Sequence, residues 1–272
     1  MATLIRFILA FVVVQLISVR PTHAISVYTF ESLTTPGDLP PQDNWSDASS
    51  GGAFIDVTAG AGSNTSTVAV SPGGGLSIHQ ARRQNDGAFS IPNFTGTETN
   101  AYLQADFRVI NGVNFNFYVT GLGGISPWIG IIDDVPAVPA IVTPHFALRG
   151  ASHGTSDYAP IPAGYDQGDW LRIRLEMDLT ANGGNGFGDV SFQNLTQGDT
   201  GFTSVAALQD RNLNMGAVDA SQWNTMGIRT DVDATASQID NLTTAVPEPS
   251  TLVLAALGLL SLGMTRRRRR RR

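Results

Sequence analysis

The chain has 272 residues, of which 42% are hydrophobic and 15% charged, with 29 glycines, 14 prolines and no cysteine. This composition is too apolar for a disordered chain and supplies many turn-forming residues, so the length suits one all-β domain with further segments at its ends. The absence of cysteine excludes disulfides, thiolate metal sites and a cysteine nucleophile.

Charge is distributed unevenly along the chain. Residues 25–245 contain 22 of the 23 acidic residues but only eight of the 17 basic residues, all of them arginine, which gives this segment a formal charge of −14. A surface this acidic repels nucleic acid and anionic lipid and favours divalent cations. Nucleic-acid binding is therefore excluded as a function.

The first 24 residues have the three parts of a secretory signal peptide. Arg6 supplies a positive charge, and residues 7–19 (FILAFVVVQLISV) form an apolar run of 13 residues. Thr22 and Ala24 place small residues at positions −3 and −1, so we predict that residues 1–24 are a signal helix cleaved after Ala24. A core helix or a membrane anchor is the alternative, but the run is short for spanning a bilayer.

Strand signals dominate the segment that follows. Short runs rich in β-branched and aromatic residues are separated by clusters of Gly, Pro, Asn and Asp, and they predict these strands: 26–30, 53–57, 67–70, 101–110, 114–120, 129–132, 145–148, 170–179, 188–194, 225–230 and 237–242. No amphipathic helix is predicted beyond the terminal segments, apart from a turn near 205–209. Many evenly spaced strands without helices favour a two-sheet β-sandwich or jelly roll.

The clearest strand is residues 170–179 (WLRIRLEMDL). Its apolar residues alternate with charged ones, which predicts one buried and one polar face. The glycine-rich residues 180–188 lead into the next predicted strand, so the two strands are expected to form a hairpin.

A second apolar segment lies near the C-terminus. Residues 251–265 (TLVLAALGLLSLGMT) are uncharged, and at about 1.5 Å per residue they cover about 22 Å of a hydrocarbon core about 30 Å thick, a marginal transmembrane helix. The arginines behind this helix do not cross readily, so they are predicted to act as a stop-transfer signal that keeps the tail in the cytoplasm and the domain outside. These residues are Arg266, Arg267, Arg268, Arg269, Arg270, Arg271 and Arg272.

Val246, Pro247, Glu248, Pro249 and Ser250 stand directly before that helix. Pro-Glu-Pro, an apolar helix and an arginine cluster, in this order over 244–272, resemble the PEP-CTERM sorting signal of Gram-negative bacteria. The resemblance implies recognition by an exosortase, transient anchoring in the inner membrane, cleavage near the motif and release to the cell surface or extracellular matrix. Such proteins are often associated with exopolysaccharide and biofilm. A simple tail anchor is the alternative.

The exported domain, expected over 25–243, resembles a second family. It opens with Phe-Glu-Ser-Leu at 30–33, contains Gly-Asp-Trp-Leu-Arg-Ile at 168–173 and ends with Gln-Ile-Asp-Asn-Leu at 238–242. This layout resembles the concanavalin A-like, laminin-G-like jelly rolls of surface proteins. The resemblance implies a two-sheet sandwich, often carbohydrate-binding or adhesive and sometimes with calcium.

Some jelly rolls of this class are endo-glycosidases with a Glu-x-Asp-x-x-Glu strand. Glu176 and Asp178 begin that pattern, but Ala181 stands where the second glutamate belongs. A retaining mechanism needs two carboxyl groups about 5 Å apart, so we expect no catalysis. Because Arg172 and Arg174 share their face, Glu176 and Asp178 are predicted to form cross-strand ion pairs instead.

Calcium binding requires several oxygens that converge from a loop. Three groups of residues could supply them, although solvated loop acids are the alternative for each: Asp133 with Asp134; Asn182, Asn185 and Asp189; and Asp231 with Asp233.

Sugar binding requires an exposed aromatic ring with an Asp or Asn nearby. The aromatic residues in loop contexts are Trp128, Tyr158 and Tyr165, whereas Trp45, Trp170 and Trp223 are expected to pack in the core. Packing is also the alternative for each of the first three.

The preferred hypothesis is a non-catalytic surface or matrix protein that binds polysaccharide or contributes to exopolysaccharide structure. The alternatives are a divergent glycosidase or lyase that acts on extracellular glycan, and a structural surface protein without a ligand.

Overall fold

The computed structural model describes residues 23–48, 55–70, 79–84, 99–110, 114–120, 127–132, 143–150, 156–215, 223–230 and 237–247. Within this part, Ile25–Val246 form one compact unit. Apart from His23 and Ala24, the predicted signal helix lies outside the described residues, as do the predicted transmembrane helix and the arginine tail. None of the helices in the described ranges has the length and hydrophobicity that a membrane crossing requires.

The chain folds into two antiparallel sheets, which confirms the prediction of an all-β two-sheet sandwich. The ten-stranded sheet contains β1 (His23–Tyr28), β2 (Gly37–Asp38), β4 (Asp56–Ala59), β5 (Thr67–Val70), β7 (Asn100–Arg108), β12 (Trp170–Asp178), β13 (Phe187–Asn194), β14 (Thr203–Ser204), β15 (Arg211–Asn212) and β17 (Gln238–Pro247). The seven-stranded sheet contains β3 (Trp45–Asp47), β6 (His79–Gln84), β8 (Asn114–Thr120), β9 (Trp128–Ile132), β10 (His145–Arg149), β11 (Asp157–Pro160) and β16 (Thr225–Thr230). The described helices are single turns: η1 (Gln42–Asn44), α2 (Ala181–Gly184) and η2 (Ala206–Leu208).

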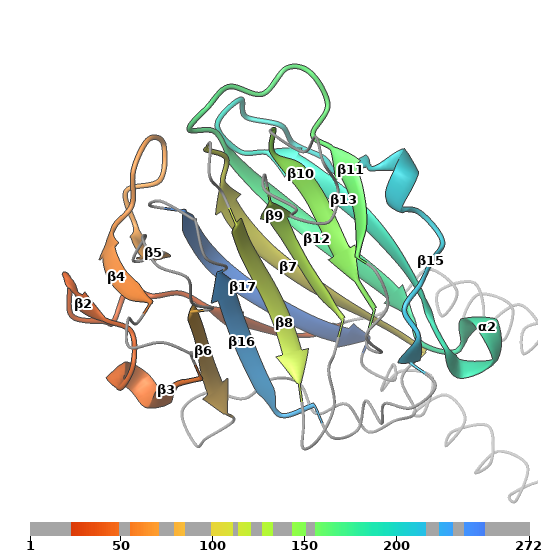
Figure 1. Cartoon of the computed structure of the whole chain (residues 1–272), viewed down its shortest axis with the longest axis horizontal. Coiled ribbons are helices and arrows are strands. Elements are labelled where there is room, and N and C mark those ends of the chain that lie inside the picture. The colour runs from red at the N-terminus through yellow and green to blue at the C-terminus, as the bar shows by residue number, and fades with distance from the viewer. Residues whose placement is uncertain are drawn as a thin grey trace, which may run out of the picture. The chain divides into compact units, whose positions relative to one another are not determined.

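The strand orders place distant parts of the chain side by side. The ten-stranded sheet runs β14-β13-β12-β7-β17-β5-β4-β2, with β1 added to β17 and β15 to β13. The seven-stranded sheet runs β11-β10-β9-β8-β16-β6-β3. Figure 1 shows β8 and β16 of this second sheet overlying β7 and β17 of the first.

The core lies between the sheets and follows the alternation along each strand. In β12 the residues Leu171, Ile173, Leu175 and Met177 are buried, as predicted, and the hairpin to β13 is formed. Phe115, Phe117 and Val119 of β8 fill the core from the other sheet. The three tryptophans expected in the core are also buried: Trp45, Trp170 and Trp223.

An arginine is buried beside one of these tryptophans. Arg83 of β6 is 1% exposed, and its Nη2 lies 3.1 Å from Asp43 Oδ1. Its guanidinium also lies over the ring of Tyr28, at 5.2 Å from the centroid. Tyr28 in turn donates to Asp43 and accepts from the Trp45 indole N–H. This packing places a charged residue in the interior with a carboxylate partner.

A glycine permits the close approach of β8 and β9. A Cβ at Gly130 of β9 would lie 2.2 Å from the carbonyl oxygen of Phe115 and 2.3 Å from Oδ1 of Asn116. Because one of these contacts is with backbone, a side chain here requires the strands to move apart.

We therefore expect Gly130→Ala to lower the free energy of unfolding by about 1–3 kcal/mol, the cost of overpacking a filled site. The matched control is Gly201→Ala, because nothing lies within 4 Å of a Cβ there, and its effect should stay within about 0.5 kcal/mol. Urea denaturation of the three proteins measures both changes. Equal midpoints for the two variants would contradict the close approach at Gly130.

Candidate functional site

Two of the three aromatic residues predicted to bind sugar lie together on the seven-stranded sheet. The expectation that they lie in loops is wrong, because Trp128 is the first residue of β9 and Tyr158 lies in β11, a strand that was not predicted. Both side chains are partly buried and pack against Ile132 and Ala147. Ala147 of β10 pairs with Tyr158 on one side and with Gly130 on the other. Trp128, Tyr158, Ile132 and Ala147 are called the aromatic patch below.

The aromatic patch faces away from the other sheet. Phe146, the neighbour of Ala147, points into the sandwich, where its ring centroid lies 5.0 Å from that of Phe192 in β13. Because side chains alternate along a strand, Ala147 and its partner Gly130 point outward. Because these two residues are small, the rings of Trp128 and Tyr158 are the largest side chains of the patch.

A buried amide borders the patch. Asn116 of β8 pairs with Gly130, and its carboxamide extends over this glycine. Asn116 is 3% exposed, and within the described part of the chain its Oδ1 accepts no hydrogen bond. A buried acceptor without a donor costs about 1–3 kcal/mol. The described residues therefore leave one buried acceptor unsatisfied at the border of the aromatic patch.

Tyr118 lies beside Trp128 and carries a polar cluster on the same face. Its ring lies over Gly227, where a Cβ would be 2.2 Å from the nearest ring atom. Its hydroxyl accepts hydrogen bonds from Gln80 Nε2 and from Arg82 Nε. Burial raises the pKa of Tyr118 and the neighbouring Arg82 opposes the rise, so the hydroxyl is neutral at pH 7.

Sequence reasoning missed Asn116, Tyr118 and the strand β6 that carries Arg82. The alternation of NFNFYVT in β8 contains the signal for the first two, because Phe115 and Phe117 point inward and the residues between them point outward. No pattern identified β6, since its inward positions include a charged residue.

The third predicted aromatic residue, Tyr165, lies apart from the aromatic patch. It is partly buried in the loop between β11 and β12, and this burial raises the pKa of its hydroxyl. The carbonyl oxygen of Gly164 in that loop accepts a hydrogen bond from Gln197, in the turn after β13.

The predicted calcium ligands fall in three places. Two of the groups lie outside the described residues: Asp133 with Asp134, and Asp231 with Asp233. In the third group, Asn185 donates to the carbonyl oxygen of Asn182 at 3.2 Å, whereas Asp189 accepts from the N–H of Asp210 at 2.6 Å. Over the described ranges, no group of three or more His, Asp or Glu side chains is placed to hold a metal ion. Calcium binding stays a prediction.

The predicted cross-strand ion pairs of Glu176 and Asp178 are wrong. Glu176 Oε1 lies 3.5 Å from Nη1 of Arg174, on its own strand. Asp178 Oδ1 accepts hydrogen bonds from the hydroxyl and N–H of Thr180 and from the N–H of Ala181. These bonds lower the pKa of Asp178 and close the turn that leads into β13.

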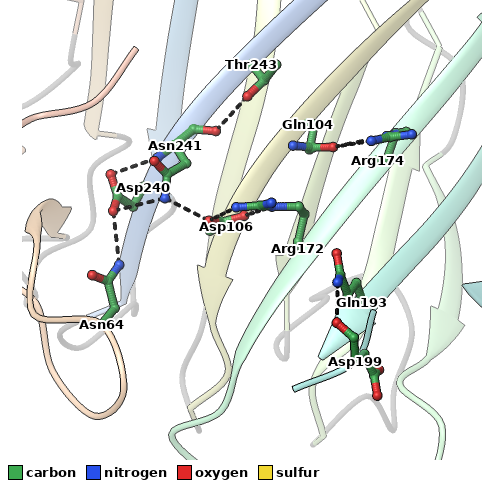
Figure 2. Close-up of polar contacts among 10 residues, drawn as sticks. All are labelled: Asn64, Gln104, Asp106, Arg172, Arg174, Gln193, Asp199, Asp240, Asn241 and Thr243. Carbon is green, nitrogen blue, oxygen red and sulfur yellow. Dashed lines mark hydrogen bonds and ion pairs between the residues drawn. The ribbon is translucent and has the colours of Figure 1, made fainter. Parts of the chain in front are cut away.

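Of the two arginines on this face of β12, Arg172 forms an ion pair with a neighbouring strand, and its partner is a buried aspartate (Figure 2). Arg172 Nε and Nη2 donate to Oδ1 and Oδ2 of Asp106 in β7 at 2.7 and 2.8 Å. Asp106 Oδ2 also accepts from Asn241 Nδ2 in β17 at 2.8 Å. One buried carboxylate thus connects β12, β7 and β17 on the outer side of the ten-stranded sheet.

A second buried aspartate, Asp240, lies next to this pair (Figure 2). It accepts hydrogen bonds from Asn64 Nδ2 at 3.0 Å and from the N–H of Asn241 at 2.7 Å. Burial raises the pKa of Asp240 to about 6, against the effect of these hydrogen bonds, and the charges of Asp106 and Glu31 add to the rise. These hydrogen bonds join Asn64 to β17 and, through Asn241, β17 to Asp106 of β7.

The last strand is longer than predicted. β17 continues beyond 242 to Pro247, and Ala245 pairs with Tyr102 of β7. Residues 245–271 match the family described as the PEP-CTERM protein-sorting motif. The C-terminal segment is a PEP-CTERM sorting signal. The sorting signal implies export and processing by an exosortase at the membrane. It covers only the end of the chain, so it assigns no function to the sandwich.

Several solved structures are similar to the sandwich. A protein of unknown function from Shewanella oneidensis MR-1 is 16% identical, with a TM-score of 0.45 over 84% of this chain and 88% of that one. The CBM2 module of the evolved Dit protein of Lactobacillus casei BL23 phage J-1 is 12% identical, with a TM-score of 0.45 over 84% and 98%. The exoplasmic/lumenal domain of VIP36, bound to Ca²⁺ and Man2, is 8% identical, with a TM-score of 0.46 over 83% and 88%.

With TM-scores below 0.5, these similarities transfer neither fold nor function, and the fold assignment rests on the strand pairing described above. No curated protein sequence matches the chain.

The raised pKa of Asp240 predicts a pH-dependent stability. The folded protein holds this proton more tightly than the unfolded chain does, so the stabilisation is fully present below the ordinary value of 3.8 and is lost as the pH rises through about 6. Between pH 4 and pH 7 the free energy of unfolding should therefore fall by roughly 2 to 2.5 kcal/mol more for the wild type than for Asp240→Asn.

Urea denaturation of both proteins across this pH range measures the difference between them. Taking the difference removes the contribution of the other carboxyl groups. Parallel profiles for the two proteins would contradict a buried, proton-binding Asp240.

Proposed function

We propose that the mature domain is a non-catalytic module of the cell surface or extracellular matrix that binds polysaccharide through the aromatic patch. The observation that carries this proposal is the placement of Trp128 and Tyr158 on one outward face, next to the acceptor Oδ1 of Asn116. Aromatic rings offer apolar faces to the C–H side of a sugar ring, while a few fixed polar groups bind its hydroxyls.

The sorting signal supports an extracellular ligand. Exosortase processing follows export, so the domain meets the polymers outside the inner membrane. A domain held in the matrix contributes to biofilm structure by binding its polysaccharide. The alternative is a structural role without a ligand. The binding experiment below distinguishes the two.

The absence of catalysis is part of the same proposal. Glu176 is paired with Arg174 on its own strand, and Ala181 occupies the position of the second glutamate in the glycosidase pattern. The test is an assay for reducing sugar released from β-glucans. Release that Glu176→Gln abolishes would favour a divergent glycosidase instead.

We expect Trp128→Ala and Tyr158→Ala each to weaken binding to the exopolysaccharide of the producing organism by at least about tenfold, equivalent to about 1.4 kcal/mol. Each substitution removes a ring on which a sugar would stack. Affinity electrophoresis of the purified domain with the polymer in the gel measures the change, and circular dichroism confirms folding.

Tyr165→Ala is the matched control, because it removes another partly buried aromatic ring that lies outside the patch. Its affinity should equal that of the wild type. Retained binding in both patch variants would refute the aromatic patch as the site, and no binding by the wild type, to this polymer or on a glycan array, would favour a purely structural role.

Processing can be tested separately with an epitope tag after Arg272. In the wild type the tag should be absent from the mature surface protein, because cleavage near the motif removes the tail. In a variant with Pro247, Glu248 and Pro249 replaced by alanine, the tagged full-length chain should remain in the membrane fraction. A strain without exosortase is the control and should show the same retained form. A tag present on the wild-type surface protein would indicate a permanent anchor.

A further inference from the structure

The outward face of the seven-stranded sheet carries basic residues on both sides of the aromatic residues. The register places Arg149, Trp128, Tyr118, Gly227 and Arg82 as successive neighbours across β10, β9, β8, β16 and β6. With strands about 4.8 Å apart, this row is about 19 Å long. The row therefore extends over several units of an extended sugar chain.

This face differs in charge from the rest of the domain. Its outward positions on the described strands hold Arg82, Arg149 and Arg229, and none of them holds an aspartate or glutamate. Residues 25–245 as a whole contain 22 acidic residues against eight arginines. Three of those eight arginines therefore lie on the outward face of the seven-stranded sheet, where the described strands hold no aspartate or glutamate.

Two of these arginines, Arg82 and Arg149, form no ion pair with a carboxylate among the described residues. Four arginines of the domain pair with carboxylates: Arg83, Arg172, Arg174 and Arg211. Within the described residues Arg82 is exposed and donates through Nε to the Tyr118 hydroxyl, while Nε of Arg149 is buried and donates to no acceptor. Arg108 on the other sheet also has a buried Nε without an acceptor among the described residues, so what distinguishes Arg149 is its position in the row that contains Trp128 and Tyr118.

We propose that the ligand is an acidic polysaccharide, whose rings stack on Trp128 and Tyr158 and whose carboxylates pair with Arg82 and Arg149. This inference rests on the proposed function and names its substrate class. Guanidinium groups suit carboxylates because they offer two parallel N–H donors to the two oxygens. The hydroxyl-accepting Oδ1 of Asn116 lies in the neighbouring row, between the two arginines.

The net charge of the domain is compatible with this ligand. At physiological ionic strength, charges more than about 8 Å apart are largely screened. A single extended polysaccharide that follows the row is therefore affected mainly by the charges of the row. A bilayer or a nucleic-acid duplex is wider and brings its phosphates against the acidic remainder of the surface, which disfavours both.

The test compares two polymers that differ only in charge, polygalacturonate and its methyl-esterified form, together with alginate as a second uronate polymer. The wild-type domain should bind polygalacturonate at least about tenfold more tightly than the ester. This preference should weaken as salt is added. Arg82→Gln and Arg149→Gln should each reduce the preference, and the double variant should abolish it.

Arg174→Gln is the matched control, because it removes the same charge from the outer face of the other sheet. Its preference for polygalacturonate should equal that of the wild type. Circular dichroism and thermal unfolding establish that each variant is folded.

The outcomes separate this inference from the proposed function. Equal, salt-insensitive binding to both polymers that Trp128→Ala abolishes overturns the acidic ligand and supports the sugar site. Uronate binding that depends on Arg82 and Arg149 but survives Trp128→Ala and Tyr158→Ala overturns the stacking site. No binding to any of the three polymers overturns the acidic ligand, as does tighter binding to phosphatidylglycerol vesicles than to polygalacturonate.

Discussion

The arrangement of the central strands depends on one buried carboxylate. Asp106 lies in β7, in the middle of the ten-stranded sheet, and is 2% exposed. A charge at such a position is tolerated only with compensating partners, which here are the two N–H groups of Arg172 and the amide of Asn241. A shift of one residue in any of the three strands would turn a partner to the other face of the sheet. The charge therefore favours one register among them.

The same register requires a break in the pairing of the last strand, at Asp240 and Asn241. The pairing of β17 with β7 shifts between Asp240 and Thr243, which inserts one extra residue as a β-bulge. Asn241 has a φ of 50°, a conformation that asparagine adopts more readily than most residues. The bulge directs the Asn241 amide to Asp106, and the strand then continues to Ala245, the first residue of the sorting signal. Residues 245–247 thus belong both to the folded sheet and to the segment that directs processing.

The sequence predicts those strands in which apolar residues mark one face. The bounds of β5, β8 and β16 agree with the prediction, and β12 differs by one residue. Alternation is clear in the sequences of β8, β12 and β16, whereas β5 is a short apolar run in which Val68 and Ala69 are both buried. It does not predict β6, where the inward Arg83 depends on Asp43, 40 positions earlier in the chain. The type of residue identifies Trp128 and Tyr158 as candidates for sugar binding. Their proximity, however, follows from the pairing of β10 with β9 and β11, and no local pattern contains that information.

The two outer faces of the sandwich differ in ion pairing and not in hydrogen-bond satisfaction, because Arg108 Nε and Gln238 Oε1 of the ten-stranded sheet are also buried without a partner among the described residues. On the ten-stranded sheet Arg172 binds Asp106, while Arg174 binds Gln104 and lies over the ring of Phe202 at 4.0 Å. On the seven-stranded sheet the described residues leave the Asn116 oxygen and the Nε of Arg149 without hydrogen bonds, on β8 and β10 next to residues of the aromatic patch. Since unsatisfied buried groups occur on both sheets, the features that distinguish the seven-stranded sheet as the proposed site are the aromatic patch and the arginines on strands whose outward positions hold no carboxylate.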